Sequence, residues 1–335
     1  MQKILRRRFA AAALCALVLA GCGNQSSPTN NAAPANTDPA GGKKIAAILM
    51  QEDQFFRLNE LGMRDAAKKH NVQLLTGSAA GALDKEINLV DTYAGQGVDA
   101  IIVSPLNPKG SAAALKRAAD KGVKIVTYNN SLDSPFVAGG LKSDDVALGA
   151  STGKVTREFI TKKLGGKAKV AVLQYVALLA DVGKLRPQGF KNEMKKLPGA
   201  QIVAEQDAWL APEAERVATA LLNAHPDLNI IWCANEGATV GATTAVKNAG
   251  KTGKVFVFGT DISDQLAGFL LSPDNILQAV TGQKPYEMGV GAMEAAVAAT
   301  SGGKVEKLRI VPGELYSRDN ATPIRAFQAQ VKALS

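Results

Sequence analysis

Short apolar runs alternate with longer amphipathic stretches along most of the chain. The apolar runs are rich in Ile, Val and Leu and have the length of strands, whereas the stretches between them repeat apolar residues at helical spacing. This alternation is typical of parallel sheets with helices on both faces. The predicted strands of the first half are Ile45–Met50, Gln73–Thr76, Ala100–Ser104 and Lys124–Tyr128, and the predicted helices are Phe55–His70, Leu83–Gln96 and Lys109–Lys121.

The same order of elements begins again at Lys169. Residue patterns repeat with it, so that Gly62 and Met63 correspond to Gly189 and Phe190. We expect two copies of one α/β unit, with chance similarity between generic strand–helix units as the alternative. The second set comprises predicted strands Lys169–Gln174, Gln201–Ala204, Asn229–Cys233, Val255–Phe258 and Ile276–Thr281, and predicted helices Ala180–Leu197, Pro212–Ala224, Ala238–Ala249 and Asp264–Leu270.

Polar and aromatic residues follow the carboxyl ends of these strands. Ligands of open parallel sheets bind beyond those ends, so two facing lobes would enclose a cleft. Carboxylates, amides and guanidinium groups can pair with sugar hydroxyls, and aromatic rings can pack against sugar C–H faces. Each residue alone could instead be a turn residue, a helix cap or part of the core. The candidate ligand-binding residues are Asp53, Phe55, Phe56, Asn129, Asn130, Arg186, Trp209, Asn235, Asp261 and Gln283.

The first 22 residues have the features of an export signal. Basic residues at Lys3 and 6–8 precede an apolar run over Phe9–Ala20, which is shorter than the roughly 20 residues that a membrane-spanning helix needs. Leu19-Ala20-Gly21-Cys22 resembles a bacterial lipobox, so we expect residues 1–21 to be removed and Cys22 to carry lipid. An ordinary signal peptide with a chance cysteine is the alternative, and the arginines also partly match a twin-arginine signal.

Residues 22–42 are almost free of bulky apolar side chains. Such a segment cannot bury enough apolar surface to offset the entropy lost on ordering, so it predicts a disordered tether. The globular body then begins at Lys43. Without residues 1–21 the chain has 35 basic and 30 acidic residues, a net charge of +5. Its lysines are scattered without interleaved aromatic residues, which argues against nucleic-acid binding.

The residues give no sign of catalytic or cofactor chemistry. Only two histidines occur, His70 and His225, and neither has a recognisable nucleophile partner. The stretch Gly149–Lys154 is one residue short of a phosphate-binding loop, and no cluster has metal-ligand spacing. Cys233 lies in an apolar strand and is expected in the core. We therefore expect no enzyme activity, no cofactor and no metal.

The body resembles the type I periplasmic binding proteins of ribose/galactose/xylose-type sugar ABC importers. No single matching segment is decisive, but their order over almost 300 residues is specific. One departure is Asn129-Asn130, where ribose binders have an acid followed by an arginine, whereas Trp209 resembles the galactose binders. The matching segments are Asp53–Phe56, Gly97–Pro105, Lys142–Asp145, Arg186–Phe190, Ala224–Asp227, Asn235-Glu236 and Gly259–Asp261.

This resemblance implies two Rossmann-like lobes joined by a three-stranded hinge, with crossovers near Ser143-Asp144, Gln283 and Gly313. The N-terminal lobe would comprise 43–143 plus 284–313, and the C-terminal lobe 144–283 plus 314–335. It also implies that the ten candidate residues contact a sugar between the lobes.

The function implied is that of a monomeric substrate-binding lipoprotein of an ABC-type sugar importer, which captures a neutral monosaccharide or sugar alcohol by hinge closure. An ABC permease would be its partner. The lipid anchor would hold it in the cell envelope, on the outer face of the cytoplasmic membrane or in the periplasm. The alternative is a sensor subunit that presents a sugar or furanosyl signal to a chemoreceptor or sensor kinase. A sugar-responsive repressor would need a DNA-binding segment where this chain has the export signal.

Overall fold

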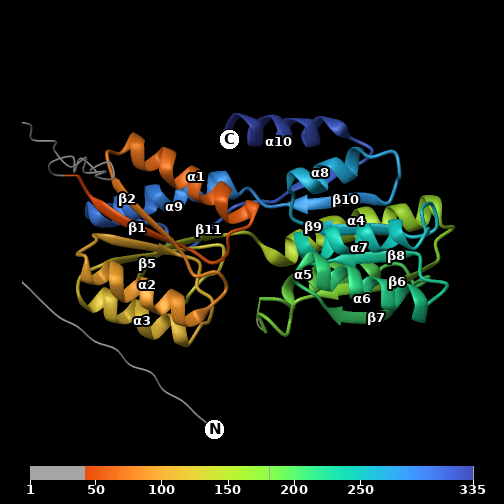
Figure 1. Cartoon of the computed structure of the whole chain (residues 1–335), viewed down its shortest axis with the longest axis horizontal. Coiled ribbons are helices and arrows are strands. Elements are labelled where there is room, and N and C mark those ends of the chain that lie inside the picture. Colours follow the sequence, from red (N-terminus) through yellow and green to blue (C-terminus); the bar gives the residue numbers. More distant parts are fainter. Residues whose placement is uncertain (1–41, 181, 335) are drawn as a thin grey trace, which may run out of the picture. The chain divides into compact units, whose positions relative to one another are not determined.

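The computed structural model describes residues 42–180 and 182–334. The predicted export signal, the lipidation site Cys22 and the predicted tether up to residue 41 lie outside the described residues. The described part contains two six-stranded sheets, each with helices packed against it (Figure 1). The predicted class of two α/β lobes is therefore confirmed.

The first sheet is entirely parallel. Its helices are α1 (Gln54–Lys69), α2 (Leu83–Gly95), α3 (Gly110–Asp120) and α9 (Pro285–Thr300). Its strands follow the order β11 (Arg309–Ile310), β5 (Val137–Lys142), β4 (Lys124–Tyr128), β3 (Ala100–Val103), β1 (Lys44–Leu49) and β2 (Gln73–Ser78).

The second sheet repeats this strand order, except that its edge strand β12 is antiparallel. Its helices are α4 (Asp145–Lys163), α5 (Leu185–Met194), α6 (Ala211–Ala224), α7 (Glu236–Asn248), α8 (Asp264–Leu271) and α10 (Ala321–Leu334). Its strands follow the order β12 (Glu314–Ser317), β10 (Leu277–Gly282), β9 (Phe256–Thr260), β8 (Ile230–Cys233), β6 (Ala168–Gln174) and β7 (Ala200–Asp207).

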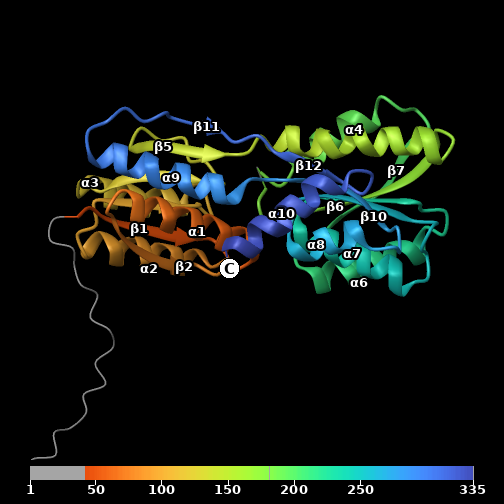
Figure 2. The same cartoon turned by 90° about the horizontal axis from the view of Figure 1, so that it is seen from above.

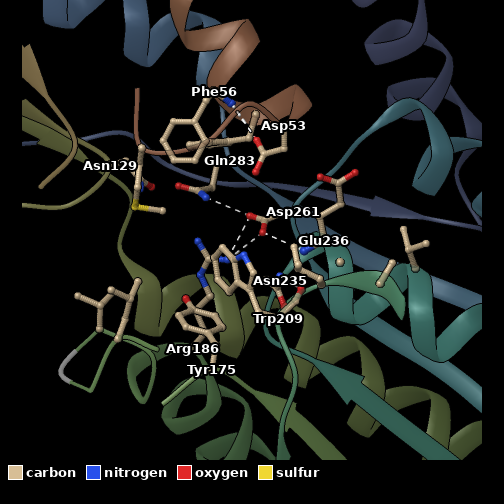
Figure 3. Close-up of a pocket in the computed structure, with 18 of the residues that line it drawn as sticks. Asp53, Phe56, Asn129, Tyr175, Arg186, Trp209, Asn235, Glu236, Asp261 and Gln283 are labelled. Carbon is tan, nitrogen blue, oxygen red and sulfur yellow. Dashed lines mark hydrogen bonds and ion pairs between the residues drawn. The ribbon is translucent and has the colours of Figure 1, made fainter. Parts of the chain in front are cut away.

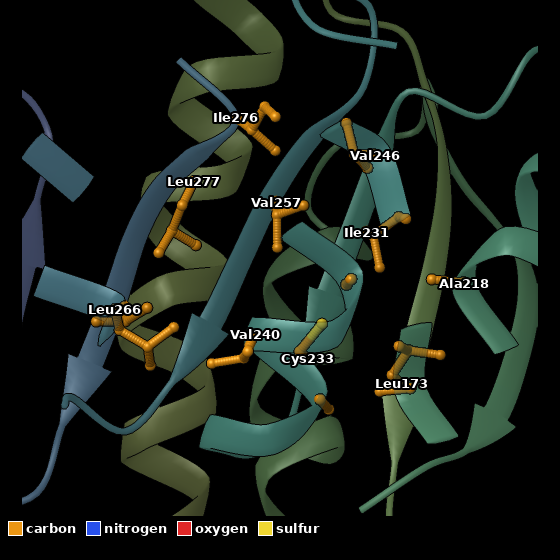
Figure 4. Close-up of a cluster of buried hydrophobic side chains, with 14 of the residues drawn as sticks. Leu173, Ala218, Ile231, Cys233, Val240, Val246, Val257, Leu266, Ile276 and Leu277 are labelled. Carbon is orange, nitrogen blue, oxygen red and sulfur yellow. The ribbon is translucent and has the colours of Figure 1, made fainter. Parts of the chain in front are cut away.

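The central strands are buried on both faces, which explains why they are apolar without alternation. In β1, Ile45 and Ala47 pack with α1 and α9, whereas Ala46 and Ile48 pack with α2 and α3. In the second lobe, one face is covered by α4 and α5 and the other by α6, α7 and α8. Figure 4 shows part of the latter cluster, including Cys233, which is fully buried as predicted.

The chain passes between the two sheets three times. The first passage joins β5 to α4, the second joins β10 to α9, and the third joins β11 to β12. The last helix, α10, packs beside α8 and β12 (Figure 2). Its Phe327 belongs to the same buried cluster as Leu58 of α1, and the two residues line one small pocket. The C-terminal helix therefore contacts elements of both lobes.

One predicted helix begins in the wrong place. The pattern predicted a helix over Ala180–Leu197, but α5 starts at Leu185. The preceding residues form tight turns closed on the carbonyl of Tyr175, and the Asp207 carboxylate accepts from the backbone N–H groups of Val176 and Ala177. These contacts keep the segment after β6 out of the helix.

Glycines allow the closest helix contacts in both lobes. A Cβ atom at Gly149 of α4 would collide with the backbone carbonyl of Arg186, and one at Gly189 of α5 would collide with the backbone of α4. Gly62 of α1 and Gly289 of α9 have the same relation to each other's helices. The repeated pattern at Gly62 and Gly189 thus has a structural meaning, because each lobe packs a helix pair through facing glycines.

No helix in the described ranges combines the length and apolar character needed to cross a membrane.

Candidate ligand-binding site

One cavity is lined by residues of both lobes at the carboxyl ends of the sheet strands (Figure 3). All ten candidate residues contribute to its wall. Its volume of about 240 Å³ lies below the roughly 300–1,000 Å³ typical of pockets for drug-sized ligands, so a small ligand fits it better. Whether these residues bind a ligand stays a prediction.

Arg186 is the centre of the second lobe's half of the cavity. It lies in the first turn of α5, and its side chain is only 7% exposed. Its Nε donates to Asp145 Oδ1 at 2.9 Å, and its Nη1 donates to the carbonyl of Ala234 at 2.9 Å and to both carboxylate oxygens of Asp261 at 3.0 and 3.1 Å. None of the hydrogen bonds found among the described residues uses Nη2, which leaves a charged donor for a ligand.

The electrostatics keep this guanidinium ionised. Burial alone lowers the pKa of an arginine, but the negative charges of Asp261 and Asp145 outweigh it, so the pKa of Arg186 is raised. The guanidinium also lies 6.0 Å from the centre of the Tyr175 ring. Burial raises the pKa of Tyr175 as well, which keeps its phenol neutral.

Asp261 connects three neighbours at the end of β9. Besides Arg186, its carboxylate accepts from Gln283 Nε2 at 3.0 Å and from the backbone N–H of Glu236 at 3.2 Å. Its φ of 70° lies in the left-handed region, where residues other than glycine are uncommon. This strain at a polar residue is typical of functional positions.

The first lobe contributes Asp53 and two phenylalanines from the start of α1. Asp53 is the N-cap of that helix, because its carboxylate accepts from Phe56 N–H at 3.1 Å. The carboxylate is nevertheless open to the cavity, and its pKa is raised mainly by desolvation and also by the charge of Asp261. Phe56 is 3% exposed and packs edge-on against Phe55 and Tyr128. Its main role is in the core, and it meets the cavity at its edge.

Asn129 and Asn130 follow β4 on the same side. Asn129 has a φ of 59°, and its Nδ2 donates to Ser104 Oγ at 3.2 Å. Asn130 is buried, and its Nδ2 donates to the Pro105 carbonyl at 3.0 Å. Both side chains therefore stabilise the loop after β3 and also face the cavity.

Trp209 and Asn235 complete the second half-site. The Trp209 ring packs edge-on against Tyr175 with their centres 4.9 Å apart. Asn235 Nδ2 donates to the Trp209 carbonyl at 2.9 Å, whereas Asn235 Oδ1 is buried and has no hydrogen-bond partner in the described part of the chain. Asn235 is 5% exposed, so its Oδ1 is a buried acceptor in need of a donor.

Three chemically important residues of the wall were not among the candidates: Asp145, Tyr175 and Glu236. Asp145 opens α4 and Glu236 opens α7, so in the sequence they resemble the acidic residues common in first helical turns. Tyr175 directly follows β6 and could have been found with the same strand-end rule that found Trp209.

Glu236 has a perturbed acidity. Burial is the main reason that its pKa is raised to about 7. The negative charges of Asp261 and Asp53 act in the same direction, whereas Ser263 and Arg57 act against it. Its half-buried carboxyl therefore changes charge around neutral pH.

The two histidines lie away from this cavity. His70 ends α1 and is exposed, whereas His225 ends α6 and is half-buried. Neither lines the cavity. Among residues 42–180 and 182–334, no group of three or more His, Cys, Asp or Glu could hold a metal ion. The near-match to a phosphate loop at Gly149–Lys154 lies inside helix α4.

Known proteins are similar to this chain over most of its length. Residues 47–304 match the family described as periplasmic binding protein domain. The ABC transporter periplasmic-binding protein YphF of Escherichia coli (strain K12) is 31% identical over 282 residues, which cover 82% of this chain and 85% of that protein. The xylitol-binding protein of Mycolicibacterium smegmatis is 30% identical over 261 residues, covering 77% and 70%.

A solved structure is similar as well. The ABC transporter periplasmic solute binding protein of Actinobacillus succinogenes, with bound D-allose, superimposes with a TM-score of 0.77 at 26% identity. The match covers 84% of this chain and 99% of that chain.

Proposed function

The chain belongs to the family of type I periplasmic binding proteins, and from that premise we propose that it binds a neutral monosaccharide or sugar alcohol for an ABC-type importer. Two relatives support this ligand class, because one is named for xylitol and the other was solved with D-allose. The observation that carries the proposal is the convergence of all ten candidate residues, from both lobes, on one small cavity.

The wall suits a polyhydroxyl ligand. Arg186 Nη2 offers charged donation, Asn235 Oδ1 offers an unpaired acceptor, and Asp53 offers a carboxylate open to the cavity. Hydroxyl groups donate and accept at once, so they can satisfy both kinds of partner. Phe55 and Trp209 contribute aromatic surface from opposite lobes for the C–H faces of a ring.

Binding proceeds by closure of the two lobes around the ligand. A ligand that contacts both half-sites favours the closed arrangement by its difference in affinity for the two arrangements. The three passages between the sheets form the hinge. The lobe boundaries that we propose are 43–143 plus 284–313 and 144–283 plus 314–335. The closed lobes, as a monomer, then present a joint surface to the permease.

The protein binds its ligand without transforming it. Three acidic residues of the cavity wall have structural partners, because Asp53 caps α1 and both Asp145 and Asp261 pair with Arg186. Import is the role that we propose, since relatives are named as ABC transporter binding proteins.

We also propose that lipid on Cys22 holds the protein in the cell envelope, close to its permease. The order of basic residues, apolar run, small residues and cysteine supports this. A Cys22→Ser variant should lose the lipid, which intact mass spectrometry measures directly, and should leave the detergent phase in phase partitioning. A parent protein without the mass of the lipid, or a variant that partitions like the parent, would contradict the anchor.

A thermal-shift screen of the globular body, residues 43–335, against pentoses, hexoses and polyols tests the ligand class. A ligand present at 100 times its dissociation constant should stabilise the protein by about 2.7 kcal/mol. Stabilisation by members of the panel would support the proposal. No shift with any of them at millimolar concentration would overturn it.

A further inference from the structure

The cavity wall carries more acid than its cations can neutralise. Asp53, Asp145, Glu236 and Asp261 line it, whereas Arg186 is its one basic residue within the described ranges. Arg186 pairs with both Asp145 and Asp261. Asp53 and Glu236 have no ion-pair partner in the part of the chain that the structure describes.

Glu236 occupies a fixed place in this acidic wall. It is the first residue of α7, directly after Asn235, and its backbone N–H is tied to Asp261 Oδ2 at 3.2 Å. Figure 3 shows its carboxyl directed away from Arg186 and toward the side of the cavity on which Asp53 lies. The charged groups that act on it are Asp261 from the end of β9 and Asp53 and Arg57 from α1.

Closure of the lobes makes an ionised Glu236 costly. A neutral ligand brings no positive charge, and it displaces water from a carboxyl that already feels the negative charges of Asp261 and Asp53. Burying an uncompensated charge is unfavourable, so the group takes up a proton instead. A protonated carboxyl then gives the acceptor-rich wall an additional hydrogen-bond donor.

The acidic residues of the wall do not form a metal site, because no group of three or more His, Cys, Asp or Glu in the described part of the chain is arranged to hold a metal ion. The buried, unpaired Asn235 Oδ1 beside Glu236 also calls for a hydrogen-bond donor. Both observations fit a ligand rich in hydroxyl groups that is held by a neutral carboxyl.

We propose that Glu236 is a further ligand-binding residue, which contacts the ligand as a neutral carboxyl, so that binding is coupled to the uptake of a proton. This inference rests on the proposed sugar or polyol function. Because the pKa of Glu236 is raised to about 7, its free carboxyl is mostly neutral at pH 6 and mostly ionised at pH 8. Affinity for a neutral ligand therefore falls over this range.

Calorimetric titration of the body with xylitol, D-allose and D-ribose, each at pH 6, 7 and 8, tests the coupling. With a free pKa of about 7, linkage predicts a dissociation constant about tenfold higher at pH 8 than at pH 6. Titrations at pH 7 in phosphate and in Tris should differ in heat by the uptake of about half a proton per ligand. The body includes both sheets and all four core clusters and is one compact unit.

Two variants assign the effect to this residue. Glu236→Gln mimics the neutral carboxyl, so its affinity should be independent of pH and, at pH 8, about tenfold tighter than that of the parent protein. Glu158→Gln, on the exposed side of α4, is the matched control and should keep the parent's pH dependence. Melting temperatures show whether each variant is folded.

Any of three results would overturn the inference. The parent protein's affinity could stay constant or rise from pH 6 to 8, the parent could take up no proton on binding, or Glu236→Gln could keep the tenfold fall in affinity. A different mechanism would follow if affinity rose with pH and this rise disappeared in Arg57→Gln. Glu236 would then act as an ionised partner of Arg57. The proton count needs no variant, so it decides even if Glu236→Gln folds poorly. Absence of binding by the parent at every pH would instead overturn the proposed function itself.

Discussion

Arg186 has both a structural role and a ligand-binding role. It joins the start of α4, the end of β8 and the end of β9 through Asp145, the Ala234 carbonyl and Asp261. The contacts with Asp145 and Ala234 are buried, and the contact with Asp261 is partly buried. A residue with this many partners cannot be removed without cost to the fold, even if its function is to hold a ligand.

Replacing Arg186 by Met should lower the free energy of unfolding by about 3–5 kcal/mol, because the buried Asp145 and the partly buried Asp261 lose their cation. Urea denaturation measures this. Arg157→Met is the matched control. Its ion pair with Glu193 is more exposed, and Glu193 still pairs with Lys196 in the variant. The expected loss of unfolding free energy is therefore about 0–1 kcal/mol. Equal losses in the two variants would contradict the central place of Arg186.

Asp53 also combines two roles, and a second helix cap allows them to be separated. Asp53 caps α1 and Asp144 caps α4 through the same kind of bond, at 3.1 and 3.0 Å. Either Ala variant should lose about 0.5–2 kcal/mol of stability. Only Asp53→Ala should weaken sugar binding, by roughly tenfold to a hundredfold, since it removes a charged hydrogen-bond partner. Similar binding losses in both variants would mean that Asp53 acts only through the helix.

The strand-end rule was sufficient to predict ten residues of the wall, because parallel strands bring their carboxyl ends to one edge. It could not separate the two roles of Asp53, Phe56 or Asn130, since capping and packing contacts are tertiary. It also missed Glu236. An acidic residue in a first helical turn is ordinary in the sequence, and only the tertiary structure brings the charges of Asp261 and Asp53 near enough to raise its pKa.

At the scale of elements, the position of α5 depends on glycines. α4 and α5 are in contact at Gly149 and Gly189, and Gly149 faces the backbone of Arg186 itself. Any side chain there must push the two helices apart. Since α5 carries Arg186, the separation would move the guanidinium out of line with Asp145 and Asp261.

Gly149→Ala should therefore destabilise the protein by about 1–3 kcal/mol, as overpacking does, and should weaken ligand binding. The control is Gly268→Ala in α8, where a new Cβ meets nothing within 4 Å. That change should stabilise the protein by roughly 0.5–1 kcal/mol, because alanine loses less backbone entropy than glycine when a helix forms. Thermal unfolding distinguishes the opposite signs, and a Gly149→Ala variant as stable as the parent would contradict the close packing.

Three of the elements that the pattern did not predict, α4, α9 and β5, have weak periodicity. Helix α4 contains several Thr and Gly, α9 is almost wholly Gly, Ala and apolar, and β5 contains two adjacent glycines. Burial explains this for α9 and β5, since a helix or strand covered on most sides needs no polar face. Helix α5 was placed too early because the turns that close on Tyr175 depend on Asp207, a residue more than 20 positions later.

At the scale of the molecule, one direct contact links the lobes beside the cavity. Gln54 Nε2 donates to Asp264 Oδ2 at 3.2 Å, and Asp264 N–H donates to Gln54 Oε1 at 3.0 Å. Gln54 belongs to α1 and Asp264 to α8. Neither residue lines the cavity, so their contact can favour the closed arrangement without touching the ligand.

Gln54→Ala should weaken sugar affinity by roughly two- to tenfold, the equivalent of one lost exposed hydrogen-bonded contact. Gln96→Ala, an exposed glutamine at the end of α2, should leave affinity unchanged. A double-mutant cycle with Asp264→Ala tests whether the two groups act together. Independent, additive effects would count against a link between the lobes.

The two tryptophans offer the most direct measurement of whether a sugar or polyol binds in this cavity. Trp232 is fully buried against Phe190, whereas Trp209 lies in the cavity wall. Titration of the body with a sugar or polyol that stabilises it should give a saturable change in tryptophan fluorescence, and Trp209→Phe should abolish the change while the Trp232 emission remains. A stabilising sugar that leaves Trp209 fluorescence unchanged, or a change that persists in Trp209→Phe, would contradict the account.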